Sequence, residues 1–312
     1  MGNQNLKILV LGGSGFIGKN LSQVLTEKNY KVTTKSRTTG LDLMDINNVQ
    51  DCLAEIKPDF IFNVAAHTGS LHYVTTYAAD VIHDNIQMSL NLYKAAQQHC
   101  PKATIVNPLS NCSYPGNADI QIEDQWWDGP VHESVFSYGN AKRFLYVLAK
   151  CYFIEHSLKS INYLVPNTFG PGDSTDPNKT HALNGMIIRM IKAQANGDKK
   201  FEIWGTGSPI REWTYVDDVV TVLVKSLSLK KSLIEPVNIG QNKGYSIKES
   251  AEFIAKALGF KGKLVFNTKY QDGAPKKILD DANFKQIFSD FVFSDHKTGI
   301  AKTAKYYQSV LK

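Results

Sequence analysis

The stretch KILVLGGSGFIG, residues 7–18, decides the fold of this 312-residue chain. A short apolar run leads at once into Gly12, Gly15 and Gly18, and then into a helix-like segment. Gly12 permits a tight turn, Gly15 lets backbone amides approach a pyrophosphate, and Gly18 lets the helix pack close to the sheet. The helix N-terminus adds its partial positive charge. Glycines recur at this spacing in many loops, but their place between a first strand and a helix predicts a dinucleotide site.

The composition is that of an ordinary globular protein. Hydrophobic residues make up 43% and charged residues 21%, and no apolar run approaches the roughly 20 residues of a membrane-spanning helix. The net charge of +6 is spread out without a basic stripe, so we expect no nucleic-acid partner, although an anionic ligand would fit. The four cysteines lack metal-type spacing and a secretory context. We therefore expect a cytoplasmic protein without a membrane anchor, metal site or disulfide.

Strand-like and helix-like segments alternate through the first half of the chain. Residues 31–35, 59–64 and 104–107 follow the first strand as further strand candidates, and residues 16–28 and 90–99 have the features of helices. Helices of this length between strands indicate right-handed crossovers. The expected fold class is therefore α/β, with a Rossmann-type doubly wound parallel sheet.

The second half of the chain differs from the first in composition and in the order of its predicted elements. Residues 167–180 are rich in Gly, Pro, Asp and Asn and predict a long loop, which a helix over 182–195 and a strand over 201–204 follow. A core-like strand over 237–240 predicts that the chain returns to the first domain before it leaves again. The predicted domains are a dinucleotide-binding domain of residues 1–166 plus 211–242, and a smaller, discontinuous C-terminal substrate domain of residues 167–210 plus 243–312.

The end of the second predicted strand indicates which dinucleotide binds. An acidic residue there would hold the adenosine ribose of NAD, whereas this chain has Ser36 and Arg37. A hydroxyl and a guanidinium suit the extra phosphate of NADP, so we predict NADPH; the alternative is a solvated charged loop. Asp42, which follows the next apolar segment, either contacts the adenine or is a turn residue.

Tyr138 and Lys142 form a Tyr-x-x-x-Lys unit far along the chain from the glycine turn. Four residues apart on a helix, the two side chains share one face. A nearby ammonium favours the phenolate, so we expect Lys142 to lower the pKa of Tyr138 and let it carry a proton. Such pairs also occur by chance on helix surfaces. Ser110, just past the strand at residues 104–107, favours a catalytic role, because ligands sit at the carboxyl ends of parallel strands.

Four longer motifs resemble those of a known family. They are SNCSYP at residues 110–115, WGTGSPIRE at 204–212, VDD at 216–218 and DGAPKK at 272–277. With the glycine turn and the Tyr-x-x-x-Lys unit, they resemble the extended short-chain dehydrogenase/reductase family over nearly the whole chain. Within it the similarity is to the GDP-L-fucose synthases, epimerase-reductases of GDP-4-keto-6-deoxymannose. The resemblance implies a GDP-sugar substrate, and we expect a homodimer.

The resemblance implies catalytic roles for Cys112 and His181, which match the epimerisation pair of the family. A hydrogen on a carbon next to a ketone is acidic because the carbanion delocalises into an enolate. Inversion of that carbon needs a base on one face and an acid on the other, and a thiolate can form next to a histidine cation. The plain alternatives are a small core cysteine and a solvated loop histidine.

Further positions match contacts with the nucleotide sugar or with the cofactor. The implied substrate residues are Asn167, Arg189, Trp204, Arg211 and Lys277. The predicted cofactor contacts are Gly12, Gly15, Phe16, Ile17, Gly18, Ser36, Arg37, Asp42, Ala65, Tyr138 and Lys142. Two departures from the family pattern lie near the expected sugar: Asn111 replaces a serine, and Asn184-Gly185 replaces a bulkier pair. They leave the identity of the sugar and the epimerisation step open.

The predicted activity is NADPH-dependent reduction at carbon-4 of a GDP-4-keto-6-deoxy sugar, with prior epimerisation at carbons 3 and 5 as the open addition. Tyr138 would donate the proton, with Lys142 supporting it and Ser110 orienting the oxygen. One alternative is a reductase without epimerisation, for a related GDP-4-keto sugar such as a 6-deoxy-heptose. Another is an NAD-retaining nucleotide-sugar 4-epimerase, against which Arg37 and Cys112 argue. A non-catalytic dinucleotide sensor is the third, against which the intact catalytic trio argues.

Overall fold

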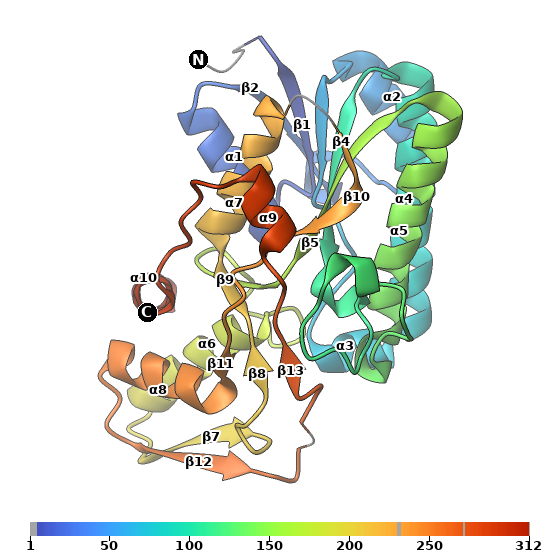
Figure 1. Cartoon of the computed structure of the whole chain (residues 1–312). Coiled ribbons are helices and arrows are strands. Elements are labelled where there is room, and N and C mark those ends of the chain that lie inside the picture. Colours follow the sequence, from blue (N-terminus) through green and yellow to red (C-terminus); the bar gives the residue numbers. More distant parts are fainter. Residues whose placement is uncertain (1–4, 230–231, 271, 312) are drawn as a thin grey trace.

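The computed structural model describes residues 5–229, 232–270 and 272–311. Its centre is a six-stranded sheet in the order β10-β5-β4-β3-β1-β2, and every neighbouring pair is parallel (Figure 1). The strands are β1 Lys7–Leu11, β2 Lys31–Lys35, β3 Phe60–Asn63, β4 Thr104–Ser110, β5 Lys159–Val165 and β10 Leu233–Asn238. The direction of winding reverses between β1 and β3. The predicted doubly wound parallel sheet is confirmed.

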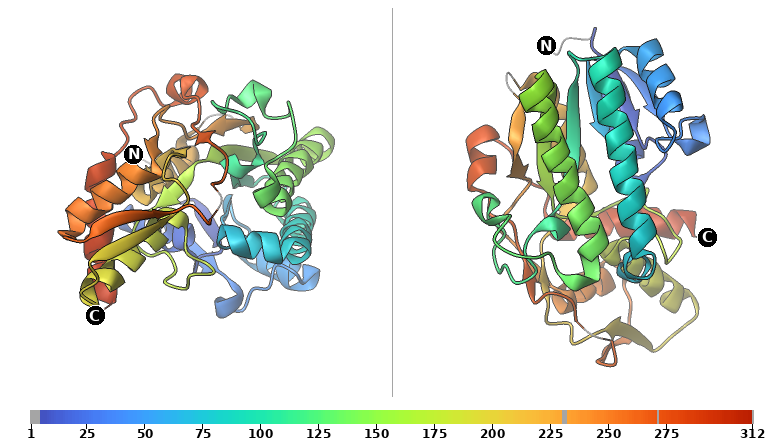
Figure 2. Two further views of the ribbon diagram at one scale, coloured as in Figure 1. Left: turned by 90° about the horizontal axis from the view of Figure 1, so that it is seen from below. Right: turned by 90° about the vertical axis from the view of Figure 1, so that its right-hand side faces the viewer.

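Helices cover both faces of this sheet (Figures 1 and 2). One face carries α1 Phe16–Glu27 and α7 Val216–Lys225, which pack against each other. The other carries α2 Ile46–Ile56, α4 Ala78–His99 and α5 Phe136–His156. Figure 2 shows α4 and α5 side by side as two long helices. Because both faces are covered, the strands can be almost continuously apolar.

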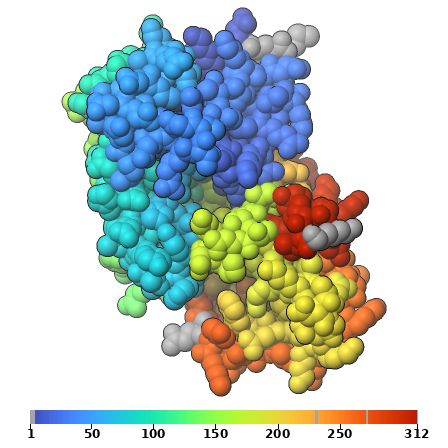
Figure 3. Space-filling view, turned by 180° about the vertical axis from the view of Figure 1, so that it is seen from behind, coloured from blue at the N-terminus to red at the C-terminus, as the bar shows by residue number. Residues whose placement is uncertain are grey.

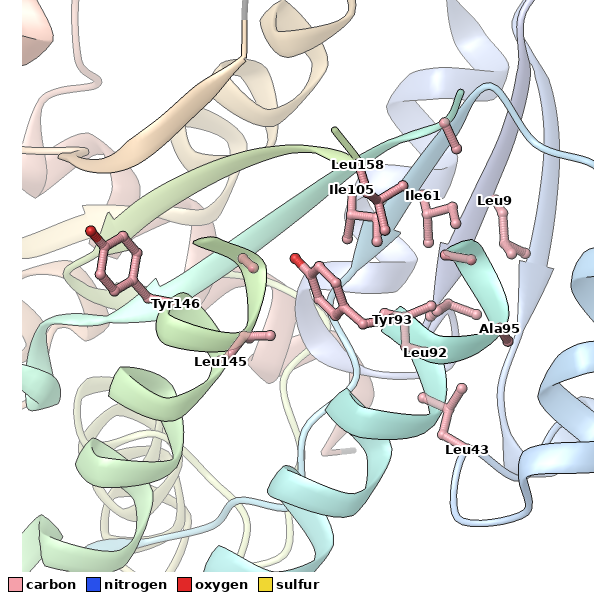
Figure 4. Packing of buried hydrophobic residues seen from close by; sticks show 14 of the residues in the cluster. Leu9, Leu43, Ile61, Leu92, Tyr93, Ala95, Ile105, Leu145, Tyr146 and Leu158 are labelled. Carbon is pink, nitrogen blue, oxygen red and sulfur yellow. The ribbon is translucent and has the colours of Figure 1, made fainter. Parts of the chain in front are cut away.

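Alternation along β1 divides the core between the two faces. Val10 lies in the buried cluster beneath α1 and α7, whereas Leu9 lies in the cluster beneath α4 and α5. Figure 4 shows this second cluster, in which strand side chains face Tyr93 of α4 and Leu145 of α5. One short run of sequence therefore supplies side chains to both layers.

A second lobe lies beneath the sheet in the view of Figure 1. Its helices α6, α8 and α10 share a third buried cluster, while β7 pairs with β12, and β8 pairs with β11 and β13. The bounds are α6 Ala182–Ala195, β7 Lys200–Trp204, β8 Ile210–Arg211, β11 Tyr245–Ser246, α8 Ile247–Leu258, β12 Lys263–Asn267, β13 Lys276–Lys277 and α10 His296–Val310. Two further short helices are α3 Leu71–Thr76 and α9 Ala282–Ile287.

Several elements depart from the sequence prediction. The helix predicted over 90–99 begins earlier, at Ala78, and the strand predicted over 104–107 continues to Ser110. The predicted loop 167–180 is wrong at its start, because β6 Asn167–Phe169 pairs with β9 Trp213–Tyr215, a partner too distant in sequence for local composition to indicate. The last core strand begins at Leu233, earlier than predicted. The domain boundaries stay a prediction. Within the described ranges no helix is long and apolar enough to cross a membrane, and the cytoplasmic location stays a prediction.

His296, at the start of α10, is buried, and neither ring nitrogen has a hydrogen-bond partner among the described residues. Its ring stacks on Tyr245 with the centroids 4.5 Å apart. Burial lowers the pKa of His296 from 6.5 to about 4; the charge of Asp295 opposes this shift and that of Lys243 adds to it.

The unfolded chain therefore binds one more proton than the folded chain between these two pKa values. We expect His296 to lower the free energy of unfolding as the pH falls from 6.5 to 4, by up to about 3 kcal/mol. The substitution His296→Phe should make stability less dependent on pH in this window. Urea unfolding at pH 7 and pH 4.5 measures the effect, and an equal loss in both proteins would contradict it.

Candidate active site

The glycine turn lies at the point where the winding of the sheet reverses. Gly12 has a φ of +84°, and a Cβ there would lie 2.7 Å from the backbone of Ala65, two residues after β3. Gly18 faces the Gly12 carbonyl, where a side chain would not fit. Among the described residues, no side chain caps α1 after Gly15, and its first turn has no acidic residue. The amides at this end of α1 can therefore bind an anion.

The end of β2 lies beside the glycine turn. The Gly12 amide donates to the Lys35 carbonyl at 2.8 Å, which places Ser36 and the exposed Arg37 next to the turn. The Asp42 carboxylate accepts from a backbone amide two residues further on, at 3.0 Å, as a turn residue does. Arg37 is thus accessible to a phosphate at this edge, while Asp42 is already engaged in its own loop.

Helix α5 is held against the turn that follows β4. A Cβ on Gly139 would lie only 2.6 Å from the Cys112 carbonyl oxygen, so helix and turn come this close because residue 139 is glycine. One helical turn further on, Lys142 Nζ donates to the Pro108 carbonyl at 3.2 Å. These two contacts fix the position of Tyr138 relative to the turn.

The turn itself is ordered by hydrogen bonds. Ser110 is the last residue of β4, and its Oγ accepts from the Cys112 amide of the turn at 3.2 Å. Arg143 of α5 donates through Nε to the Ser113 carbonyl at 2.7 Å and through Nη2 to the Trp126 carbonyl at 2.6 Å. Sequence reasoning missed Arg143, because nothing local distinguishes it from a solvated helix residue.

The surroundings of Tyr138 set its protonation. Burial raises the pKa of the phenol, the nearby Cys112 adds to the rise, and a hydrogen bond with Thr68 opposes it. The Nζ of Lys142 lies 5.4 Å from the centre of the Tyr138 ring, and burial lowers the pKa of Lys142 to about 8. The prediction that Lys142 lowers the pKa of Tyr138 is wrong here, because burial dominates. Tyr138 is therefore a protonated phenol at neutral pH, the form that a proton donor needs.

Arg211 of β8 brings the second lobe to this turn. Burial lowers the pKa of its guanidinium, and the charges of Cys112 and Asp272 oppose the shift, so both groups are its neighbours. Lys277 of β13 pairs with Arg211 across the small sheet, and the Asn167 amide donates to the carbonyl of the residue after Arg211 at 3.2 Å. The structure thus brings Arg211 near Cys112 and places Lys277 and Asn167 beside Arg211.

His181 precedes α6 and faces the dinucleotide turn. Its ring centroid lies 5.5 Å from that of Phe16, which starts α1 together with Ile17. Its Nδ1 lies 3.1 Å from Asp173 Oδ2, and Asp173 is a neighbour that sequence reasoning did not find. Within the described residues, no hydrogen bond or ring contact joins His181 to Cys112.

A backbone contact joins the two halves of the site. The Ser70 amide donates to the Asn178 carbonyl at 2.7 Å, and a Cβ on Gly69 would lie 2.6 Å from the same oxygen. The loop that carries His181 is thereby tied to the loop of Thr68, which contacts Tyr138. Figure 3 shows the yellow-green part of the chain lying between the blue and cyan first lobe and the yellow second lobe.

Arg189 and Trp204 meet elsewhere on the second lobe. The guanidinium carbon of Arg189 lies 4.3 Å from the Trp204 ring centroid, and its Nη1 donates to the Glu202 carbonyl at 3.2 Å. Trp204, which is 52% exposed, stacks on Tyr270 with the centroids 4.9 Å apart. Tyr270 was missed from sequence, because no motif contains it.

Comparisons with known proteins agree with this geometry. The family model described as the NAD dependent epimerase/dehydratase family matches residues 8–240. The chain is similar to a putative GDP-L-fucose synthase of Arabidopsis thaliana, at 30% identity over 97% of this chain and 92% of the relative. It is also similar to a GDP-L-colitose synthase of Yersinia pseudotuberculosis, at 29% identity over 97% of this chain and 98% of the relative.

A solved structure supports the same assignment. The GDP-L-fucose synthetase from Naegleria fowleri bound to NADP superposes with a TM-score of 0.88, at 26% identity over 99% of this chain and 94% of that chain. The family match includes the glycine turn, the turn after β4 and the whole of α5. This chain therefore belongs to the NAD dependent epimerase/dehydratase family, within the extended short-chain dehydrogenases/reductases.

Proposed function

We propose that this protein is an NADPH-dependent enzyme that epimerises carbons 3 and 5 of a GDP-4-keto-6-deoxy sugar and then reduces carbon-4. The observation that carries the proposal is the contact of α5 with the turn after β4, which brings Ser110, Cys112 and Tyr138 together. This turn and the dinucleotide turn both follow the carboxyl ends of strands in the same parallel sheet. The relatives named as synthases of GDP-L-fucose and GDP-L-colitose supply the substrate class.

The residues around the glycine turn fit NADPH. The uncapped start of α1 suits the pyrophosphate of the cofactor. Gly12, which packs closely against the Ala65 backbone, has no side chain that would block the pyrophosphate. The exposed Arg37 suits the ribose phosphate. When bound, NADPH supplies the hydride for carbon-4. Tyr138 then donates its phenolic proton to the oxygen on that carbon, and Ser110 orients the same oxygen by a hydrogen bond. Lys142 stabilises the phenolate that forms.

Epimerisation uses two other side chains. A Cys112 thiolate takes the proton from the carbon next to the ketone, and the enolate spreads the negative charge onto the carbonyl oxygen. His181 returns a proton from the opposite face and so inverts the carbon. Cys112 comes from the first lobe and His181 from the second, so the substrate must lie between the lobes.

The second lobe supplies groups for the nucleotide part of the substrate. Arg211 and Lys277 are cations that suit the diphosphate. The exposed Trp204 and Tyr270 form a flat aromatic stack with Arg189 against it, which suits a planar base. The proposed substrate therefore extends from Cys112 towards this stack.

The proposed function is tested by incubating the protein with GDP-4-keto-6-deoxymannose in deuterated water, with and without NADPH. We expect deuterium at carbons 3 and 5 in both cases, and NADPH oxidation when NADPH is present. Mass spectrometry and NMR of the sugar measure both. Reduction without deuterium at carbons 3 and 5 would mean that the enzyme is a reductase without epimerase activity. The absence of both reactions would mean that the substrate is another sugar.

The variant Cys112→Ser separates the two halves of the reaction, because a hydroxyl is a far weaker acid than a thiol. We expect exchange at carbons 3 and 5 to fall by at least about 100-fold. Reduction of the ketone that has already been epimerised should remain. Parallel loss of both activities would contradict the assignment of Cys112.

Cofactor choice is tested by Arg37→Ala. Loss of one charge-assisted contact to the ribose phosphate should raise the KM for NADPH by about 10- to 100-fold, while the KM for NADH changes little. Lys31→Ala, at the other end of β2, is the matched control. A similar rise in KM for NADPH and for NADH would mean that Arg37 does not contact the ribose phosphate.

We also propose a homodimer formed through α5. Val147, Cys151 and Ile154 are exposed and spaced four and three residues apart, which aligns them on one helix face, and Ile154 is 73% exposed. Ile154→Glu should convert the dimer to a monomer. Light scattering after gel filtration measures the mass, with Val292→Glu in an exposed loop as the control. A monomeric wild-type protein would refute the proposal.

A further inference from the structure

A buried carboxylate stands behind His181. The Asp173 side chain is 3% exposed, whereas that of His181 is 44% exposed, and Asp173 Oδ2 lies 3.1 Å from His181 Nδ1. The same oxygen accepts from the backbone amide of His181 at 2.9 Å. On its other side, the His181 ring packs against Phe16. One carboxylate oxygen therefore holds both the ring and the backbone of this residue.

Asp173 is itself held firmly. The Asn184 side-chain amide donates to Oδ2 at 2.8 Å, the Ser174 backbone amide donates to Oδ1 at 2.9 Å, and the Tyr307 hydroxyl donates to the Asp173 carbonyl at 3.2 Å. Asn184 is fully buried, and its Oδ1 accepts from the Gly170 amide at 3.1 Å. A carboxylate fixed from several elements can fix a neighbouring ring in turn.

We infer that Asp173 is the positioning residue of His181: it accepts the Nδ1 proton, fixes the tautomer and turns Nε2 towards the substrate. This inference rests on the proposed function, in which His181 supplies the proton for epimerisation. The charge state of Asp173 agrees with the role. Burial raises its pKa, but hydrogen bonding and charge from His181, together with the Asn184 amide, outweigh burial and lower the pKa below its usual value.

With Asp173 in this role, every proton that Cys112 and His181 exchange during epimerisation is accounted for. The Cys112 thiolate becomes a thiol as it takes the proton from carbon-3 or carbon-5. The His181 imidazolium gives its Nε2 proton to the opposite face of that carbon and becomes neutral, and its remaining proton stays on Nδ1, bonded to Asp173. Exchange with water then deprotonates the thiol and reprotonates Nε2, so no oxidant or reductant is needed.

Asn184 supports this arrangement through its hydrogen bond to Asp173. From sequence, the Asn184-Gly185 pair looked like a change near the sugar. In the structure Asn184 has no exposed surface and acts on Asp173. At this position the departure from the family pattern therefore supports Asp173, and through it His181.

The test measures two reactions in the full-length variant Asp173→Asn. Deuterium exchange at carbons 3 and 5 should fall by about 10- to 100-fold, which is part of the contribution of a correctly positioned general acid. NADPH-dependent reduction of the ketone that is already epimerised should stay close to wild type. Thr180→Ala is the control, because it removes hydroxyl bonds to the Ser174 and Asp176 carbonyls in the same loop and leaves the Asp173 carboxylate contacts intact.

Two further readouts separate positioning from a general structural role. In a His181→Ala background, Asp173→Asn should cause no additional loss of exchange, whereas additive losses would overturn the inference. Nitrogen NMR of the wild-type His181 ring should show a proton on Nδ1, and a neutral ring with its proton on Nε2 would overturn the inference as well. If the wild type reduces but does not exchange, epimerisation fails as a function, and the NMR result still decides the role of Asp173.

Discussion

The close approach of Gly139 to the Cys112 carbonyl is the constraint on which the rest of the site depends. It lets α5 lie directly on the turn after β4, and the bond from Lys142 to the Pro108 carbonyl fixes the helix one turn further on. Because that turn is the carboxyl end of a central strand, Tyr138 faces the same edge of the sheet as the glycine turn. The contact between Gly139 and the Cys112 carbonyl therefore determines both the packing of α5 and the position of the proposed catalytic residues.

The proton donors proposed for reduction and for epimerisation differ in their exposure to solvent. Lys142 is buried and Tyr138 is partly buried in the first lobe, and burial raises the pKa of the phenol. His181 lies on the second lobe, half exposed, with the buried Asp173 behind it. Both donors must recover a proton before the next turnover: the phenolate of Tyr138 does so beside Lys142, and the exposed ring of His181 does so directly from water. The Ser70–Asn178 contact holds the surroundings of the two donors together.

Sequence reasoning predicted what local patterns encode. The apolar run and glycines of β1 and α1 predicted the sheet and the dinucleotide turn, because steric and periodic requirements act within a few residues there. Asp173, Thr68 and Tyr270 were missed, since each matters through a partner that is brought close only by folding. The sign of the Tyr138 shift was wrong for the same reason: the spacing to Lys142 is visible in sequence, but burial is not.

The most direct test of the account is the rate of hydride transfer in Gly139→Ala, followed in a single turnover at saturating NADPH with the epimerised ketone. A Cβ at residue 139 must push α5 away from the Cys112 carbonyl, and a displacement of this kind should slow the transfer by at least about 10-fold while the protein stays folded. Gly185→Ala is the control, because its Cβ would make only ordinary contact, at 3.4 Å, with Thr180. An unchanged rate in Gly139→Ala would contradict the account.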